Sequence, residues 1–331
     1  MSIKIKMAGF LMGIMCFAAG AELNAAAYAD NSDAPQAAEA AESEASDAEA
    51  VVRHYIENAE NGDAEAQCGL GYCYYRGIGF AQNYEEAVKW FRRAADQGLS
   101  DAQTLLAMCY FEGTGVAKDC QEAEKLFLRS AEQGNIKAQL MLGGIYLTGE
   151  AGIEANPAEA VRWLKRASEQ QEVSEMRAYA QMMLSELYFK GIGTEKNNQE
   201  ALRLLRQSAE FGNSDAQCKL ASIYLTGEIV ESDCEEAFKW AHKAAEQNDA
   251  EAQAMLGGLY FFGNGAEKNL DEAEKWFRKS ADQECALGEY MLGVYYENAG
   301  NNDEAAKWYK KAADQGLEDA AEALNNLKKQ P

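Results

Sequence analysis

The dipeptide Ala-Gln recurs along the chain at a nearly constant spacing, and this repetition constrains the fold more than any other feature. It begins at six positions about 36 residues apart, with one longer interval: Ala66, Ala102, Ala138, Ala180, Ala216 and Ala252. Gly288 and Ala320 continue the series where the dipeptide itself has changed. A period of this length indicates an array of stacked helix pairs, in which each unit packs only against its neighbours.

Hydrophobic positions define the first helix of each repeat. Counted from the repeat alanine, leucine stands four residues on and tyrosine eight residues on in seven repeats, beginning with Leu70 and Tyr74. Positions zero, four, seven and eight share one face of an α-helix, so we expect this face to pack inward. A glycine eleven residues on, from Gly77 to Gly263, ends the predicted helix, as C-terminal glycines commonly do.

A second helix follows in every repeat. Its start is marked by Asn or Asp with Glu three residues later, a capping-box-like spacing that Asn83 and Glu86 introduce. The same spacing recurs at Asp119, Asn156, Asn197, Asp233, Asn269 and Asn301. All five tryptophans occupy one position of this helix: Trp90, Trp163, Trp240, Trp276 and Trp308. Such repetition indicates packing rather than a cofactor site.

The combined pattern resembles a known repeat family. Ala-x-x-x-Leu-Gly-x-x-Tyr, Gly-x-Gly and Asn-x-x-Glu-Ala-x-x-Trp-Phe-x-x-Ala-Ala-x-x-Gly are similar to the Sel-one-like repeat (SLR) family, a relative of the tetratricopeptide repeat. The resemblance covers roughly residues 48–331. It implies an all-α, right-handed α-solenoid of antiparallel helix pairs whose first helices line a concave face, and a secreted bacterial protein that binds other proteins.

The repeat pattern predicts the domain organisation. A half-repeat (47–62) precedes seven repeats and a C-terminal cap (317–331), since solenoids need capped ends. The repeats span 63–98, 99–134, 135–171, 172–212, 213–248, 249–284 and 285–316. The third has one extra residue in its inter-helix loop and is followed by five more in Gln171–Arg177, whereas the seventh lacks four between Tyr296 and Asn301.

The N-terminus has the features of a secretory signal. Lys4 and Lys6 precede an apolar run over 7–21, and Ala27-Tyr28-Ala29 forms a small-x-small cleavage site before Asp30. The apolar run is shorter than the roughly 20 residues that a membrane anchor needs. Bulky Met15 disfavours lipoprotein processing at Cys16. We therefore expect a signal peptide (1–29), a disordered acidic linker (30–46) and a periplasmic or extracellular product.

Net charge limits the choice of partners. The chain carries a formal net charge of −23, which repels phosphate backbones and anionic lipids. We expect a monomer that binds neither nucleic acid nor the membrane interior, with a protein or peptide as its partner.

Candidate catalytic residues are few. The sequence contains two histidines, His54 and His242, and neither lies at catalytic or ligand spacing from a partner, so we expect no catalytic residue, cofactor or metal. The resemblance also implies an alternative function, because some secreted relatives are described as β-lactam-binding or β-lactamase-like. That chemistry needs Ser-x-x-Lys, and no serine here has lysine three residues on.

Seven cysteines remain outside the signal peptide, so at least one cannot pair within the chain. No Cys-x-x-Cys occurs that would indicate zinc or redox chemistry. Some secreted relatives cross-link their helices through regular cysteine pairs. This resemblance suggests Cys109 with Cys120, which belong to one repeat.

The candidate binding surface consists of positions two, six, nine and ten of the first helices, which should face the concave groove and which vary between repeats. Position nine could instead pack against a neighbouring second helix. Aromatic, methionine and charged side chains there are typical of an interaction surface for an extended peptide or a partner helix. The predicted groove residues are Tyr72, Arg76, Thr104, Met108, Phe111, Glu112, Met182, Glu186, Phe189, Lys190, Phe262 and Tyr290.

Overall fold

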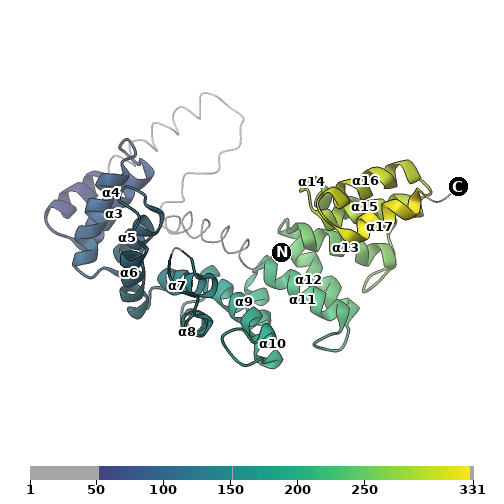
Figure 1. Cartoon of the computed structure of the whole chain (residues 1–331), viewed down its shortest axis with the longest axis horizontal. Coiled ribbons are helices and arrows are strands. Elements are labelled where there is room, and N and C mark those ends of the chain that lie inside the picture. Colours follow the sequence, from purple (N-terminus) through teal and green to yellow (C-terminus); the bar gives the residue numbers. More distant parts are fainter. Residues whose placement is uncertain (1–51, 151, 329–331) are drawn as a thin grey trace. The chain divides into compact units, whose positions relative to one another are not determined.

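The computed structural model describes residues 52–150 and 152–328, and this part of the chain is helical, without strands. The predicted signal peptide, the linker and residues 47–51 lie outside it. Figure 1 shows helices joined by loops, and the described chain divides into two compact units. Unit 1 comprises residues 52–180 with 191–195, and unit 2 comprises residues 181–190 with 196–328.

Unit 1 begins with the helical segment 52–60, followed by three helix pairs. Neighbouring helices pack against one another in chain order from α3 to α8. The pairs are α3 (Ala64–Arg76) with α4 (Tyr84–Asp96), α5 (Ser100–Glu112) with α6 (Cys120–Glu132), and α7 (Ile136–Thr148) with α8 (Pro157–Ser168).

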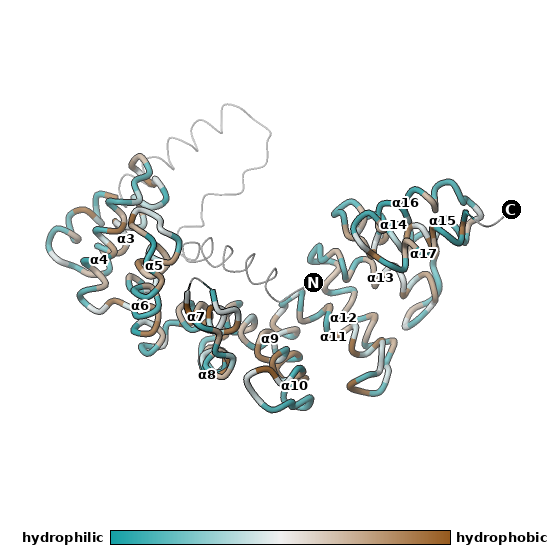
Figure 2. The backbone as a smooth tube through the Cα atoms, in the orientation of Figure 1, coloured by the Kyte–Doolittle hydropathy of each residue, from teal (hydrophilic) through white to brown (hydrophobic). Residues whose placement is uncertain are grey.

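Helix α9 (Glu175–Lys190) contributes its first residues to unit 1 and the rest to unit 2. In unit 2, α10 to α17 again pack in chain order. They are α10 (Asn198–Phe211), α11 (Ser214–Thr226), α12 (Cys234–Glu246), α13 (Ala250–Phe262), α14 (Leu270–Asp282), α15 (Ala286–Asn298), α16 (Asn302–Asp314) and α17 (Glu318–Leu327). The described residues thus form an all-α solenoid that contains seven helix pairs, and the predicted fold class is confirmed. Hydrophobic and hydrophilic stretches alternate along the helices (Figure 2), as packing of one face requires.

The second helices begin as predicted, but with only half of a capping box. The side chain of Asn83 accepts a hydrogen bond from the Glu86 amide at 3.0 Å, while the Asn83 amide donates to the Tyr74 carbonyl at 2.9 Å. This backbone bond satisfies the Asn83 amide, which in a full capping box would bind the Glu86 carboxylate. Glu86 instead forms an ion pair with Lys89 at 2.7 Å. The same three contacts recur in the repeats of α6, α12, α14 and α16.

In six of the seven pairs the core forms where a ring or a leucine side chain lies over a small residue. Position five of the first helix, buried in every repeat, is Gly, Ala or Ser. A Cβ atom built on Gly71 would come within 2.7 Å of the Phe91 ring, and one on Gly257 within 2.5 Å of Phe277. The side chains of Phe91 and Phe277 are fully buried. The small residue therefore lets the two helices of a pair approach closely.

Buried glutamines join consecutive repeats. Gln253, which follows the repeat alanine, donates from Nε2 to the Ala245 carbonyl of the preceding second helix at 3.3 Å. Its Oε1 accepts from Gln283 Nε2, at the end of its own repeat's second helix, at 2.8 Å. Gln67, Gln103, Gln139 and Gln217 make the same pair of bonds. Each buried amide thus adds a second hydrogen bond to a helix C-terminal carbonyl, which also accepts one from the backbone amide three residues on.

The tryptophans pack as their repetition predicts. Trp163, Trp240 and Trp276 are buried. Each of the five rings also makes a cation–π contact with the basic residue three positions on. In the Trp276 pair, Lys279 Nζ lies 3.9 Å from the ring centroid. The other pairs are Arg93 on Trp90, Arg166 on Trp163, Lys243 on Trp240 and Lys311 on Trp308. These contacts bury the rings and occupy the cations of the second helices.

The repeat tyrosines are only half-buried, which differs from the expectation that position eight packs fully inward. In four repeats the hydroxyl group of this tyrosine reaches the preceding second helix. Arg92 donates to the Tyr110 hydroxyl at 2.6 Å, and the Tyr146 hydroxyl donates to Glu124 at 2.6 Å. In these four repeats the ring therefore packs at the edge of the core while its polar end is hydrogen-bonded.

Candidate protein-interaction surface

In five first helices the fully exposed residues lie along one narrow stripe. Every exposed residue of α3, α5, α11, α13 and α15 lies either one position before the repeat alanine or ten positions after it. Positions three and six lie between them on the same helical face and are mostly half-buried. We call these four positions the open stripe. Its ends are exposed and its floor is mostly half-buried, whereas the remaining positions of these helices are buried or half-buried.

The predicted groove residues fall into three groups. Arg76, Glu112, Lys190 and Phe262 are exposed, and all four occupy position ten of the open stripe. Tyr72, Phe111, Glu186, Phe189 and Tyr290 are half-buried. Thr104, Met108 and Met182 are buried, with 1%, 6% and 8% of their surface exposed.

For these three residues the expectation of an accessible side chain is wrong. The Thr104 hydroxyl lies between helices, 2.8 Å from Ser130 Oγ and 3.1 Å from the Ser100 carbonyl. Met182 shares position two with Thr104, and this position is buried in five of the seven repeats, so it is a packing position. Met108 is at position six of the stripe, where a flexible thioether can fill a gap between helices.

Three neighbouring charges on the stripe of unit 2 already pair with one another. Glu186 contacts Lys190 Nζ at 3.3 Å and Lys219 Nζ, from α11, at 3.5 Å. In unit 1, partial desolvation of its carboxyl group by neighbouring residues raises the pKa of Glu112, and a hydrogen bond from Thr114 and the charge of Lys118 partly offset this rise. These groups would exchange protein contacts for ligand contacts on binding.

Sequence reasoning missed the stripe positions one before and three after the repeat alanine. On α13 and α15 these are Glu251, Met255, Leu287 and Met291. Their spacing along the helix places them on the same face as position ten. This spacing could have identified them from the sequence. Leu287, with 39% of its surface exposed, and Phe262, with 62%, are large hydrophobic side chains in contact with solvent.

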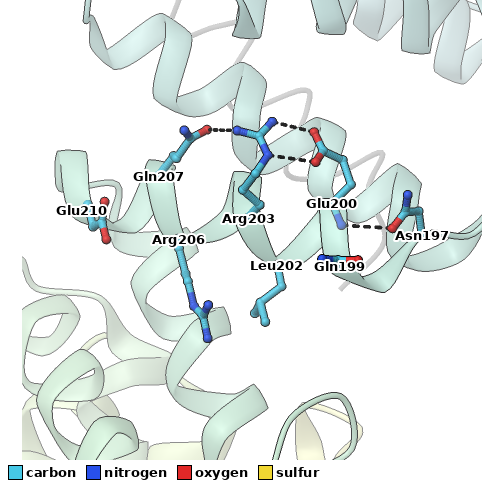
Figure 3. A pocket seen from close by; sticks show the side chains of 8 residues that line it. All are labelled: Asn197, Gln199, Glu200, Leu202, Arg203, Arg206, Gln207 and Glu210. Atoms are coloured by element: carbon cyan, nitrogen blue, oxygen red, sulfur yellow. Dashed lines mark hydrogen bonds and ion pairs between the residues drawn. The ribbon is translucent and has the colours of Figure 1, made fainter.

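A polar hollow of about 520 Å³ lies on α10 and its N-cap (Figure 3). It is lined by Asn197, Gln199, Glu200, Leu202, Arg203, Arg206, Gln207 and Glu210. Arg203 donates two hydrogen bonds to Glu200, at 2.5 and 2.8 Å, and one to Gln207 at 3.1 Å. Arg206 donates to the Tyr224 hydroxyl at 2.9 Å. Both arginines therefore act within the protein's own hydrogen-bond network.

Comparison with known proteins agrees with this geometry. The Sel1 repeat family model matches seven consecutive segments, 64–99, 100–135, 136–172, 178–213, 214–249, 250–285 and 286–317. The chain belongs to the Sel1 repeat family. The comparison with curated proteins gave no match.

Two solved structures share the Sel1 repeat fold. A protective antigen of uropathogenic Escherichia coli strains that displays an SLR fold is 35% identical, with a TM-score of 0.75. The match covers 83% of this chain but only 58% of the antigen's length. A Sel1 repeat protein from Oxalobacter formigenes is 27% identical over 96% of this chain and 87% of its own, with a TM-score of 0.65. Sel1 repeat solenoids are commonly non-catalytic protein-interaction scaffolds.

The cysteines of the Sel1 repeats do not form the suggested pair. Cys109 and Cys120 are free thiols, and Cys120 Sγ instead lies 4.0 Å from the Phe111 carbonyl. Burial raises the pKa of Cys109 and of Cys68 to about 12 and that of Cys73 to about 11. These thiols stay protonated near neutral pH and are therefore poor nucleophiles.

The histidines and acids of the Sel1 repeats lie in structural surroundings. His242 lies between the Phe238 and Trp276 rings, with centroids 6.0 and 6.3 Å away, and its Nδ1 is 3.5 Å from Glu246. Within the described residues, no group of three His, Cys, Asp or Glu side chains could hold a metal ion. None of the described helices is long and apolar enough to cross a membrane. No observation favours the β-lactamase-like alternative.

Proposed function

We propose that this Sel1 repeat protein is a non-enzymatic scaffold that binds a peptide or a helix of a partner protein along the open stripe of its first helices. The observation that carries the proposal is variation at one accessible position. Position ten holds Arg76, Glu112, Thr148, Lys190, Thr226, Phe262 and Asn298, whereas the packed positions zero, four and five hold Ala or Gly, Leu, and Gly, Ala or Ser. Folding alone does not require this variety on an exposed face.

Within each unit, the half-buried neighbours of position ten would supply contact area. In unit 1, Lys118 Nζ lies 5.7 Å from the centroid of the Phe111 ring. In unit 2, Phe189 directly precedes Lys190 on α9. Aromatic rings beside charged groups are the usual composition of protein-binding hot spots. Of the predicted groove residues, those that are accessible remain the proposed contacts.

Site-specific photo-crosslinking tests this function. A benzophenone amino acid at Arg76, Glu112, Lys190 or Phe262 should cross-link one shared partner from envelope extracts, identified by mass spectrometry. Lys89 and Lys239, exposed on second helices, are the controls and should give little product. Cross-links that form only from the two control positions would place the ligand on the other face and contradict the proposal.

We also propose that the chain is exported, with a mature N-terminus at Asp30. The support is the sequence of residues 1–30, a basic start, an apolar run and a small-x-small site. Intact-mass measurement of exported protein should give a chain lacking residues 1–29. A lipid-modified product that begins at Cys16 would disprove this processing.

A further inference from the structure

The open stripe changes character at the C-terminal end of unit 2. On α11 its four positions are polar: Asp215, Lys219, Ser222 and Thr226. On α13 and α15 six of the eight are apolar, and the exceptions are Glu251 and Asn298; the others are Met255, Gly258, Phe262, Leu287, Met291 and Val294. Helices α13 and α15 are in direct contact, so these positions form one surface, which we call the C-terminal stripe.

A notch lies in the middle of this surface. Gly258 stands between Met255 and Phe262 on α13, and a Cβ atom added there would meet only Met291 Cε, at 3.7 Å. Position 258 therefore has room for a side chain, unlike Gly257 beside it, whose Cβ atom would overlap the Phe277 ring. Two methionines border the notch, and their flexible thioethers can adapt to different apolar side chains.

The exposed aromatic ring at the edge of the notch is held by its neighbours. The Phe262 and Phe261 rings meet edge to face at 5.0 Å between centroids, and Phe261 in turn lies 6.4 Å from the Tyr295 ring. Phe261 is buried in the core of this repeat. Phe262 is thus anchored on the core while its outer face contacts solvent, which suits a binding anchor.

The charges around the C-terminal stripe are negative. Glu251 is the one charged residue on the stripe positions of α13 and α15. Tyr290, one helical turn from Leu287 and Val294, has its pKa raised by burial and then by the negative charges of Asp319, Glu297 and Glu322. Glu297 already accepts a hydrogen bond from Tyr309 at 2.6 Å, whereas Asp319 and Glu322 are exposed on α17.

The nearby cations are held by other groups. Lys268 lies 5.7 Å from the Phe261 ring centroid, and Arg278 pairs with Glu274 at 2.7 Å. Lys279 and Lys311 lie over tryptophan rings of second helices. An apolar surface with an acidic rim and engaged cations matches a ligand with apolar side chains and positive charge.

We infer that the C-terminal stripe, with the acidic face of α17, is a docking site for a basic amphipathic helix, whose apolar side chain enters the notch at Gly258. Lysine or arginine side chains of the ligand would lie toward Glu251, Asp319 and Glu322. This inference rests on the proposed function and specifies the chemistry of the partner and where it binds.

The test uses a fluorescein-labelled helical peptide of leucine and lysine, about 14 residues long, with its leucines on one face. Its affinity for the mature chain is measured by fluorescence anisotropy at physiological salt. Gly258→Leu should fill the notch and weaken binding at least ten-fold without loss of helicity, because the site has room. Ser222→Leu, the same stripe position on α11, is the matched control and should leave binding unchanged.

Charge is tested with a second pair of variants. Asp319→Asn with Glu322→Gln should also weaken binding at least ten-fold, whereas Glu231→Gln with Glu235→Gln, which removes the same charge near α12, should have little effect. Equal losses from both pairs, or none from Gly258→Leu, would overturn the inference in favour of diffuse attraction. A self-associated chain in sedimentation that Gly258→Leu dissociates would also overturn it, because a second copy would then be the occupant.

The outcome can be separated from that of the scaffold function. If photo-crosslinking from Arg76 or Glu112 captures a partner but the leucine-lysine peptide does not bind at the notch, only this inference fails. If neither the open stripe nor the C-terminal stripe captures a ligand, the scaffold function fails as well.

Discussion

Replacing Gly265 by alanine should lower the free energy of unfolding of the surrounding repeats by about 3 kcal/mol. Gly265 lies in the loop after α13 with a φ of +74°, and a Cβ atom there would overlap the Cys234 carbonyl oxygen at the start of α12. Two costs add, the strain of a left-handed alanine and the overlap with backbone that cannot rotate away. Hydrogen exchange of α12 and α13 and urea unfolding followed by circular dichroism would measure the loss.

Gly300→Ala separates the two costs. Gly300 has a φ of +76°, almost the same as Gly265, but a Cβ atom there would meet nothing within 4 Å. This variant should therefore show the backbone strain alone, about 1 kcal/mol. Similar losses from the two variants would mean that the close approach of the loop to the preceding repeat contributes nothing.

The same approach recurs in unit 1, where Gly115 lies against the Tyr84 carbonyl and Gly193 against the Pro157 carbonyl. The second glycine of the Gly-x-Gly motif thus serves the contact between repeats, whereas the first ends the helix. Sequence reasoning explained only the first, because a glycine that ends a helix follows from local chain geometry. Contact with the preceding repeat does not.

Local signals predicted the helices well. The Asn and Asp caps, the glycines that end first helices and the apolar positions zero and four all lie where expected. Each depends on residues within one turn or one helix face, so the sequence contains the whole cause. The expected hydrogen bond from the cap amide to the glutamate side chain does not form. The cap amide instead donates to the carbonyl of a tyrosine in the preceding helix.

The binding surface was harder to predict, for a physical reason. A first helix contacts its own second helix, the preceding second helix and, for α13 and α15, another first helix. Only a small part of the helix surface therefore remains in contact with solvent. The pattern of apolar residues alone does not show which part that is. Thr104 and Met182 lie almost opposite the repeat alanine and were expected to be free, yet they are packed.

The buried glutamines show a related limit. Gln253 and its equivalents mark the repeat register, but polarity alone argues against burial, so they were assigned no structural role. Their repetition at one position was the available signal. Their partners are carbonyls and amides of other helices, which become evident only when the repeats are stacked.

The largest loss should come from Phe277→Ala, about 3–5 kcal/mol, because this fully buried ring lies over Gly257 within the α13–α14 pair. Gly257→Ala alone should lower the free energy of unfolding by about 1 kcal/mol, a low value for overpacking. The value is low because repeat 2 accommodates an alanine and a phenylalanine, Ala107 and Phe127, at the equivalent positions. Urea unfolding of the two single variants and the double variant would complete a double-mutant cycle.

The sign of the second substitution should reverse in the background of the first. Once the ring is removed, the Cβ atom added at position 257 no longer overlaps it, and alanine stabilises a helix interior by about 1 kcal/mol relative to glycine. The two substitutions should therefore be coupled by about 2 kcal/mol. Repeat 5 already pairs two alanines, Ala221 and Ala241, at these positions, and both are buried. An equal cost of Gly257→Ala with and without the ring would mean that Phe277 does not set the requirement for glycine. The backbone around Ala273 would then set it, since the Ala273 carbonyl oxygen lies 3.1 Å from the added Cβ atom.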